Sequence, residues 1–201
     1  MNDKCKTEIE HGYKIFSKAA NIWGLGSEAG KRRVLRRIRF FIEFGNISNK
    51  TRALEIGCGT GIFTNIIGKE GANIVAFDLS WPLLREADNI EHNGTRIKYI
   101  IANAEILPFK EDSFDLVYGN AILHHLNISV VLREINKVLK KGGRAVFSEP
   151  NMLNPQIMIQ KNISFVKRLM GDTPYETAFF RWKIKRIFLE QGFTEVKVMP
   201  Y

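Results

Sequence analysis

A glycine-rich turn preceded by an acid is the most informative stretch of this 201-residue sequence. In ALEIGCGTGIFTNII, residues 53–67, a short apolar run ends and Gly57, Gly59 and Gly61 lead into a helical pattern. Glycines at such a turn permit unusual backbone angles and let a ligand approach the backbone closely. We expect exposed N–H groups at the start of the helix, which favour an anionic ligand group. Glu55 adds a carboxylate just before the first glycine.

A second acid, Asp78, ends the next expected strand. In a strand–helix–strand unit, a carboxylate at this place can accept hydrogen bonds from both hydroxyls of an adenosine ribose. The turn and the distant acid together predict a ligand that contains a nucleoside, bound at the carboxyl edge of a sheet.

Two kinds of cofactor compete for this pattern. The dinucleotide fingerprint G-x-G-x-x-G needs a third glycine where this chain has Ile62. A carboxylate at Glu55 would repel a pyrophosphate, whereas it would attract the ammonium group of an amino acid. The residues therefore favour an adenosyl amino acid over NAD. A glycine turn that binds no ligand is the remaining alternative.

Alternating strands and helices must position these side chains. We expect strands at 52–56, 73–77, 96–101, 114–118 and 144–148, and helices at 62–69, 81–91 and 130–139. Short apolar strands that alternate with amphipathic helices predict an α/β fold, a doubly wound and mostly parallel Rossmann-like sheet with helices on both faces.

The two flanks are expected to be mainly helical. Residues 9–43 predict two helices, with Ser27 as the N-cap of the second. Beyond the fifth strand the pattern predicts helices at 152–170 and 177–191, a C-cap glycine at Gly192 and a sixth strand at 194–199. We predict a helical leader or lid over 1–50 and an α/β domain over 51–201, in which 150–176 form a cap over the site.

Composition narrows the class of protein. The net charge is +9, and much of the excess lies in KRRVLRRIRFFIEF, where Val34, Leu35, Ile38 and Phe41 recur at helical spacing. The charges therefore predict the solvated face of an amphipathic helix, although contact with RNA or an acidic membrane is an alternative. The chain has two cysteines, no apolar run long enough to span a bilayer and no apolar signal core near its start. We expect a cytoplasmic protein.

Four segments in order resemble the motifs of class I S-adenosylmethionine-dependent methyltransferases. They are ALEIGCGTGIFT, VAFDLS, ANAEILPFKEDSFDLVYGNAILHHL and LREINKVLKKGGRAVFSEPN. The similarity is greatest to the small-molecule branch that includes ubiquinone and menaquinone biosynthesis enzymes. It covers residues 50–150 strongly and the flanks weakly. The family implies S-adenosylmethionine as cofactor and S-adenosylhomocysteine as product.

The resemblance also implies roles for single residues. Glu55 and the glycines of the turn should line the methionine end of the cofactor, and Asp78 should hold the ribose. Leu79 should lie against the adenine, and Ala104 should offer its backbone N–H to the ring. Asn103 stands where the family usually carries Asp, but its amide oxygen can still accept a hydrogen bond from the adenine amine. Asn120 should face the methionine moiety or the methyl group.

A general base is needed only if the methyl acceptor must lose a proton. The candidates are His124, which follows the fourth strand beside His125, and Glu149, which ends the fifth strand. Packing or helix capping is the alternative for either histidine, and a hydrogen bond to a loop backbone is the alternative for Glu149. We expect no metal ion, because adjacent histidines rarely converge on one ion and no Cys/His cluster accompanies them.

Aromatic residues of the leader resemble those of the helix that closes over the cofactor in this family. Tyr13, Phe16 and Trp23 are placed to shield a sulfonium, for which an aromatic face is electrostatically favourable. Plain packing of the helix is the alternative for each of them.

The cap segment is rich in Met, Ile and Phe, which suits a small, partly apolar acceptor. The alternatives are an RNA methyltransferase, which only the charge supports, and a non-catalytic module that binds the cofactor. No sequence remains for the family's seventh strand, so we expect a truncated chain or a sheet edge completed by a second copy.

Overall fold

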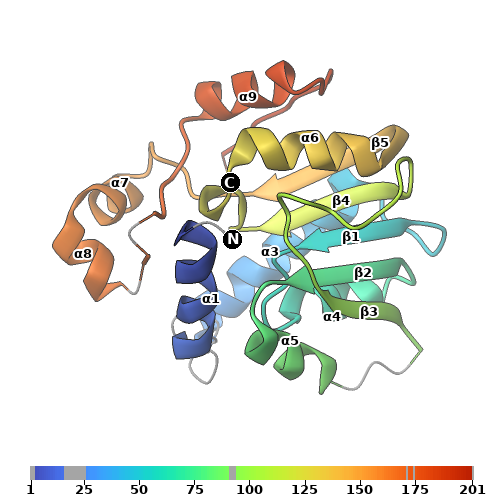
Figure 1. The fold of residues 1–201 in the computed structure, drawn as a ribbon, viewed down its shortest axis with the longest axis horizontal. Helices are drawn as coiled ribbons and strands as arrows, with labels where there is room; N and C mark the ends of the chain where they lie inside the picture. Colours follow the sequence, from blue (N-terminus) through green and yellow to red (C-terminus); the bar gives the residue numbers. More distant parts are fainter. Residues whose placement is uncertain (1–2, 16–25, 91–93, 171, 174, 201) are drawn as a thin grey trace.

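The computed structural model describes residues 3–15, 26–90, 94–170, 172–173 and 175–200. At its centre lies a parallel sheet of five strands in the order β3-β2-β1-β4-β5 (Figure 1). The strands are β1 (Arg52–Ile56), β2 (Asn73–Asp78), β3 (Arg96–Ile101), β4 (Phe114–Asn120) and β5 (Leu139–Ser148). The predicted α/β fold is confirmed, and β1 and β3 have the predicted bounds.

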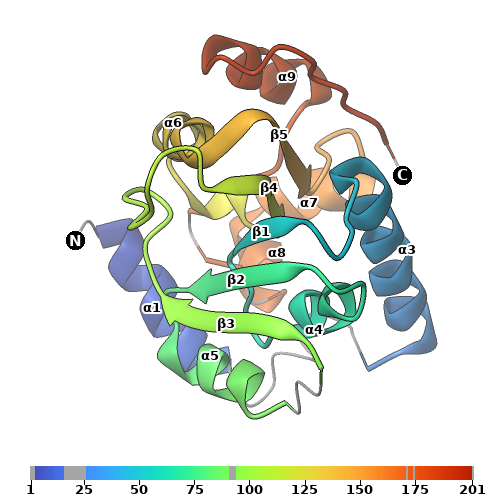
Figure 2. The same cartoon turned by 90° about the vertical axis from the view of Figure 1, so that its right-hand side faces the viewer.

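Helices cover both faces of this sheet, because successive side chains of a strand point to opposite sides. Leu54 and Ile56 of β1 pack against α6 (Ile128–Val138) and α9 (Arg181–Glu190), whereas Ala53 packs on the opposite face. That face is covered by α3 (Glu28–Gly45), α4 (Ile62–Gly68) and α5 (Trp81–Asp88) (Figure 2).

The flanking elements lie beyond the carboxyl ends of the strands. Helix α1 (Asp3–Ile15) passes close to the start of α5, where a Cβ at Gly12 would lie 2.5 Å from the Ser80 hydroxyl. A short 3₁₀ helix, η2 (Leu123–His125), follows β4, and α7 (Pro155–Asn162) and α8 (Ser164–Leu169) form the cap. Figure 1 shows α7 and α8 apart from the sheet, with α1 between them and the strands.

Several helix boundaries agree with capping signals in the sequence. The Ser27 hydroxyl accepts a hydrogen bond from the backbone N–H of Gly30 at 3.0 Å, so the predicted N-cap of α3 is confirmed. Gly192 has a φ of 90° directly after the C-cap of α9, as expected for a residue at that position. Among the described residues, no helix is both long and apolar enough to cross a bilayer.

Three expectations for the C-terminal third were wrong. The predicted helix over 152–170 is two short helices that meet at Ile163, and the helix predicted over 177–191 begins only at Arg181. The predicted strand over 194–199 pairs with no described strand. In this segment apolar and polar residues alternate, and Val196 packs against the core beside α9. That packing does not require hydrogen bonds to a neighbouring strand. Strand β5 therefore lies at the edge of the sheet, and its pairing with a second copy stays a prediction.

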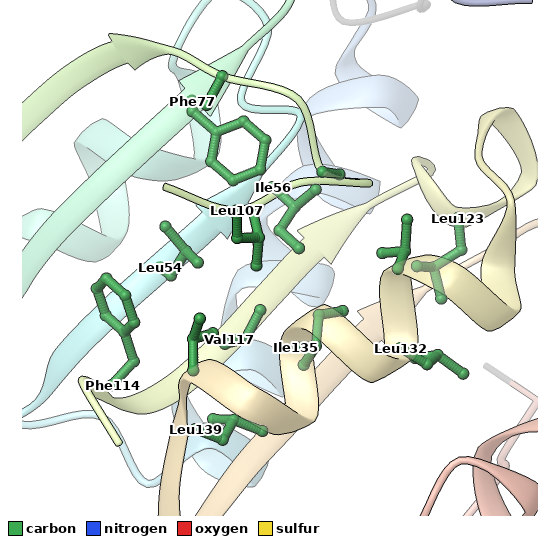
Figure 3. Close-up of a cluster of buried hydrophobic side chains, with 14 of the residues drawn as sticks. Leu54, Ile56, Phe77, Leu107, Phe114, Val117, Leu123, Leu132, Ile135 and Leu139 are labelled. Atoms are coloured by element: carbon green, nitrogen blue, oxygen red, sulfur yellow. The ribbon is translucent and has the colours of Figure 1, made fainter. Parts of the chain in front are cut away.

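The α6 face contains the larger core. Figure 3 shows Ile135 of α6 beside Val117 of the sheet, and both side chains are fully buried. Burial of such aliphatic side chains supplies most of the free energy that holds α6 on the sheet.

We predict that Ile135→Ala lowers the free energy of unfolding by roughly 2–5 kcal/mol, because it leaves a cavity between α6 and the sheet. Chemical denaturation measures this change. Leu35→Ala on α3 is the control, since that side chain is 51% exposed, and it should change the value by less than about 0.5 kcal/mol. Equal effects of the two substitutions would contradict the assignment of this core.

Candidate functional site

A continuous hollow of about 1840 Å³ runs along the carboxyl ends of the strands and on toward the edge of β5. Five separate parts of the chain meet around its deeper end. They are α1 (Glu8, His11, Gly12, Ile15), the glycine turn (Gly57, Cys58, Gly59), the end of β2 (Asp78, Leu79), the end of β4 with the loop after it (Asn120, His124, His125) and the segment from β5 through the cap (Glu149, Leu153, Ile157, Glu176). Most of the predicted site residues are thereby brought together.

The glycine turn is closed by its own hydrogen bonds. Gly57, Gly59 and Gly61 all have positive φ, between 53° and 74°. The N–H groups of Gly57 and Cys58 donate to the Phe77 carbonyl, and the N–H of Gly61 donates to the Cys58 carbonyl. These three N–H groups are therefore satisfied within the protein and do not offer themselves to a pyrophosphate, whereas the predicted exposure of the N–H groups at the start of α4 stays a prediction. Gly61 does not line the hollow; it is the N-cap of α4 and lies against Tyr99 and Ala87.

Glu55 lies in the wall of the hollow with only 2% of its surface exposed. One of its oxygens, Oε2, accepts hydrogen bonds from the Thr64 hydroxyl at 2.6 Å and the Tyr118 hydroxyl at 2.7 Å. Burial raises the pKa of this carboxyl to about 7, although the two hydrogen bonds act to lower it. Its predicted contact with the methionine end of a cofactor stays a prediction.

Asp78 connects the glycine turn to the end of β2. Its Oδ2 accepts a hydrogen bond from the N–H of Gly59 and its Oδ1 accepts one from the N–H of Ser80, both at 2.9 Å. Burial raises the pKa of Asp78, which the backbone donors oppose. A carboxylate has about four lone-pair positions, so Asp78 keeps capacity for a further donor beside its backbone donors. Asp78 and the adjoining Leu79 both line the hollow, as a ribose and adenine site requires.

Of the two residues predicted to hydrogen-bond the adenine, only one lines the hollow. Ala104 lines the hollow and is 3% exposed, but Asn103 is not among the lining residues. The Asn103 Oδ1 accepts a hydrogen bond from the N–H of Glu105 at 2.9 Å, so the amide closes a local turn. The structure does not place Asn103 at the hollow, since its short side chain bonds its own backbone.

Asn120, the last residue of β4, has a buried Oδ1 without a hydrogen-bond partner among the described atoms, and the residue lines the hollow. A buried acceptor of this kind costs free energy unless a ligand supplies a donor. This unsatisfied acceptor, the free lone pairs of Asp78 and the nearby Glu55 carboxyl fit an adenosyl amino acid with ribose hydroxyls and an ammonium group.

The leader contributes different residues from those predicted. Tyr13 is 53% exposed and does not line the hollow, because α1 turns Glu8, His11, Gly12 and Ile15 toward it instead. Trp23 and Phe16 lie outside the described residues, so their predicted contact with a sulfonium stays a prediction.

His124 and Glu149 form a buried pair. The His124 Nδ1 lies 2.7 Å from the Glu149 Oε2, and the two side chains are 4% and 6% exposed. The other oxygen of Glu149 accepts hydrogen bonds from the N–H groups of Ile122 and Leu123, at 2.9 and 2.8 Å. Glu149 therefore anchors the loop after β4, which was the alternative to a catalytic role. A role of His124 or Glu149 as general base stays a prediction.

Charged residues that sequence reasoning missed surround this pair. Glu8 of α1 lies 2.9 Å from the His125 Nδ1 and accepts a hydrogen bond from the Thr173 hydroxyl. Glu176 accepts hydrogen bonds from the Lys161 ammonium at 2.6 Å and the Thr173 N–H at 2.8 Å. No spacing in the sequence signals these contacts, because they join α1, the loop after β4 and the cap.

The charges of this cluster are mutually stabilising. Burial disfavours the charged form of His125, but the adjacent Glu8 carboxylate raises the pKa of His125 above its ordinary value. Burial likewise opposes ionisation of Glu176, but the charge of His125 and the hydrogen bond from Lys161 lower its pKa to about 2. Electrostatic attraction thus holds the leader helix against the cap and the sheet.

Comparison with known proteins supports the site. Residues 54–147, which contain the glycine turn, Asp78 and the loop after β4, match the family model described as "Methyltransferase domain". This chain carries a methyltransferase domain. The resemblance to class I S-adenosylmethionine-dependent methyltransferases with small-molecule relatives, stated from the sequence, is confirmed.

The relatives differ in length. An uncharacterized protein of Methanocaldococcus jannaschii is 35% identical over 134 residues, which are 66% of this chain and 50% of that protein. The malonyl-[acyl-carrier protein] O-methyltransferase of Hamiltonella defensa is 29% identical over 66% of this chain and 49% of its own length. The chain spans about half the length of these two relatives. The demethylmenaquinone methyltransferase of Geobacillus kaustophilus is 27% identical over 98% of this chain and 94% of its own length.

Solved structures confirm the fold. An S-adenosylmethionine dependent methyltransferase of Mesorhizobium loti superposes with a TM-score of 0.61 at 23% identity, covering 78% of this chain and 79% of that chain. Phosphoethanolamine N-methyltransferase 2 of Haemonchus contortus, solved with S-adenosyl-L-methionine, gives 0.65 at 20% identity, covering 86% of this chain and 40% of that chain.

The raised pKa of Glu55 predicts a pH-dependent stability. At pH values between the ordinary 4.5 and about 7, folded Glu55 keeps a proton that the unfolded chain has lost. Its contribution to the free energy of unfolding is therefore present below pH 4.5 and decreases as the pH rises to about 7. Denaturation of the wild type and Glu55→Gln across this range should show a steeper decrease in the wild type, by the part that Glu55 contributes. Glu70→Gln, which changes an exposed acid, should behave as the wild type does.

Proposed function

We propose that this chain transfers a methyl group from S-adenosylmethionine to a small, partly apolar acceptor. The observation that carries the proposal is one continuous hollow with two kinds of wall. Asp78 and Asn120 form a polar wall suited to the cofactor. Leu153, Ile157 and Met170 of the cap contribute an apolar wall beyond it.

Methyl transfer from a sulfonium requires the protein mainly to position the two reactants. S-adenosylmethionine supplies a methyl group on a sulfonium, which is already reactive toward a nucleophile. The chain holds the ribose end through Asp78 and orients the amino-acid end through Asn120 and Glu55, and residues of α1 and the cap line the rest of the hollow. Correct placement of two reactants can supply most of the acceleration in such a displacement.

The named relatives act on small or carrier-bound acceptors, namely demethylmenaquinone and malonyl-[acyl-carrier protein]. The apolar cap lining supports the same class for this chain. RNA as acceptor is supported by net charge alone, and much of that charge lies on α3, whose apolar residues Val34, Ile38 and Phe41 are buried in the core. A non-catalytic module would bind the cofactor without turnover.

Asp78→Asn should weaken the binding of S-adenosylhomocysteine at least about tenfold, because it replaces a charged acceptor of the ribose hydroxyls. Isothermal titration calorimetry measures the change. Asp88→Asn, on the exposed end of α5, should bind as the wild type does. Thermal unfolding verifies that both variants fold.

Transfer of a labelled methyl group to a panel of quinols, acyl thioesters and tRNA then tests the acceptor class. Turnover confined to the small apolar acceptors is the expected result. Turnover on tRNA alone would overturn the proposal, and cofactor binding without any turnover would favour the non-catalytic module.

We propose further that the cap brings the chain to anionic membranes. Helices α7 and α8 carry no buried apolar residue, and Phe165 and Leu169, one helical turn apart, are 67% and 73% exposed. Lys167 and Arg168 lie on the same helix, and the net charge of +9 complements an acidic lipid surface. A membrane contact here would place the apolar wall of the hollow beside the lipid phase that holds apolar acceptors.

Co-sedimentation with vesicles of phosphatidylcholine and phosphatidylglycerol tests this contact. The double variant Phe165→Glu, Leu169→Glu should bind the vesicles at least about tenfold more weakly than the wild type, since two apolar side chains no longer insert. Ile106→Glu is the matched control, because Ile106 is 75% exposed at a site outside the cap. Equal binding of both variants, or no binding by the wild type, would refute the contact.

A further inference from the structure

Three side chains with metal-ligating atoms converge where the loop after β4 meets the cap. His124, His125 and Glu176 each offer one ligand atom, and these atoms lie within 4.8 Å of one another. The His124 Nε2 is 3.8 Å from the Glu176 Oε2. No other group of this kind occurs in the part of the chain that the structure describes. The two adjacent histidines did not by themselves predict a metal site, because Glu176 approaches them only through the fold of the cap.

The second nitrogen of each histidine already faces a carboxylate. The His124 Nδ1 lies 2.7 Å from Glu149, and the His125 Nδ1 lies 2.9 Å from Glu8. In metal sites, a ligating histidine usually directs its other ring nitrogen to a carboxylate, which sets the tautomer and the ring orientation. This arrangement leaves the Nε2 atoms of both rings as ligands.

The third ligand is also held in place. The Glu176 Oε1 accepts a hydrogen bond from the Thr173 N–H, and its Oε2 accepts one from the Lys161 ammonium. Lys161 is itself 4% exposed and pairs with Asp172 at 2.9 Å. Fixed ligands reduce the entropy that is lost when an ion binds.

The charges of the cluster favour a cation. Four carboxyl groups, those of Glu8, Glu149, Asp172 and Glu176, pair with the Lys161 ammonium and the two histidines, so acidic groups outnumber basic ones in this cluster. These side chains are largely buried, where uncompensated charge is costly. A dication would neutralise most of the excess without displacing Lys161 from Asp172.

We propose that His124, His125 and Glu176 bind one divalent transition-metal ion of the class Mn²⁺, Fe²⁺, Co²⁺ or Zn²⁺. Two imidazole nitrogens and one carboxylate oxygen suit these ions and leave coordination positions open. Ligands about 2.0–2.2 Å from such an ion lie closer together than the observed spread, so small side-chain rotations complete the site. Because the cluster lines the same hollow, the open positions face the acceptor end and suit an oxygen of the acceptor. His124 then acts as a ligand and not as a general base.

Metal binding is measured without cofactor or acceptor, so its failure is distinct from failure of the proposed methyl transfer. The untagged chain is freed of metal with a chelator and titrated with Co²⁺. We expect one equivalent to bind and to produce visible absorption bands of a nitrogen- and oxygen-ligated ion. Glu176→Gln and His125→Ala should weaken binding at least about a hundredfold, and Glu8→Gln about ten- to a hundredfold.

His11→Ala is the matched control, since His11 lies on α1 but outside the cluster. It should bind Co²⁺ as the wild type does. If the ligand variants do not fold, paramagnetic broadening of histidine ring signals in the wild type gives the answer, with His124 and His125 affected before His11. An absence of stoichiometric binding by the wild type, or equal affinity in Glu176→Gln, would overturn the proposal.

Discussion

The carboxylate of Asp78 is the constraint on which the site depends. By accepting one hydrogen bond from Gly59 and one from Ser80, it joins the turn after β1 to the start of α5. The turn can adopt this path only because Gly57, Gly59 and Gly61 tolerate positive φ. Since the N–H groups of Gly57, Cys58, Gly59 and Gly61 bond within the protein, the site presents mainly carboxyl and amide oxygens to a ligand. That polarity selects a ligand rich in donors, such as ribose hydroxyls and an ammonium group.

A second set of interactions joins the leader helix and the cap at the hollow. Glu8, His125 and Glu176 come from the leader helix, the loop after β4 and the cap, and each is stable as a buried charge only beside the others. The leader and the cap are therefore coupled to the loop that holds Asn120 and His124. The same coupling places acidic and imidazole groups at the acceptor end, beside the apolar lining supplied by the cap.

Much of the fold followed from local patterns. The bounds of β1 and β3 were predicted because buried parallel strands are short apolar runs with sharp ends, and the Ser27 cap was predicted because a hydroxyl there can satisfy an open N–H. The cap was predicted less well. Met, Ile and Phe continue a helical pattern through Ile163, but α7 and α8 have no fully buried apolar residue, so no core packing stabilises one long helix. Residues 194–199 alternate like a strand, yet only Val196 is held by the core.

The candidate site also has parts that the sequence predicted and parts that only the tertiary structure showed. The amino-acid sequence by itself determined the glycine turn, its acid and Asp78, because a continuous strand–turn–helix segment carries its geometry in the residues that build it. Tertiary structure alone decided that Tyr13 faces solvent, that Asn103 bonds its own backbone and that Glu149 anchors a loop. It alone also brought Glu8 and Glu176 to the histidines. Such contacts join residues far apart in the chain, and their energies depend on burial and neighbouring charge, which no local spacing records.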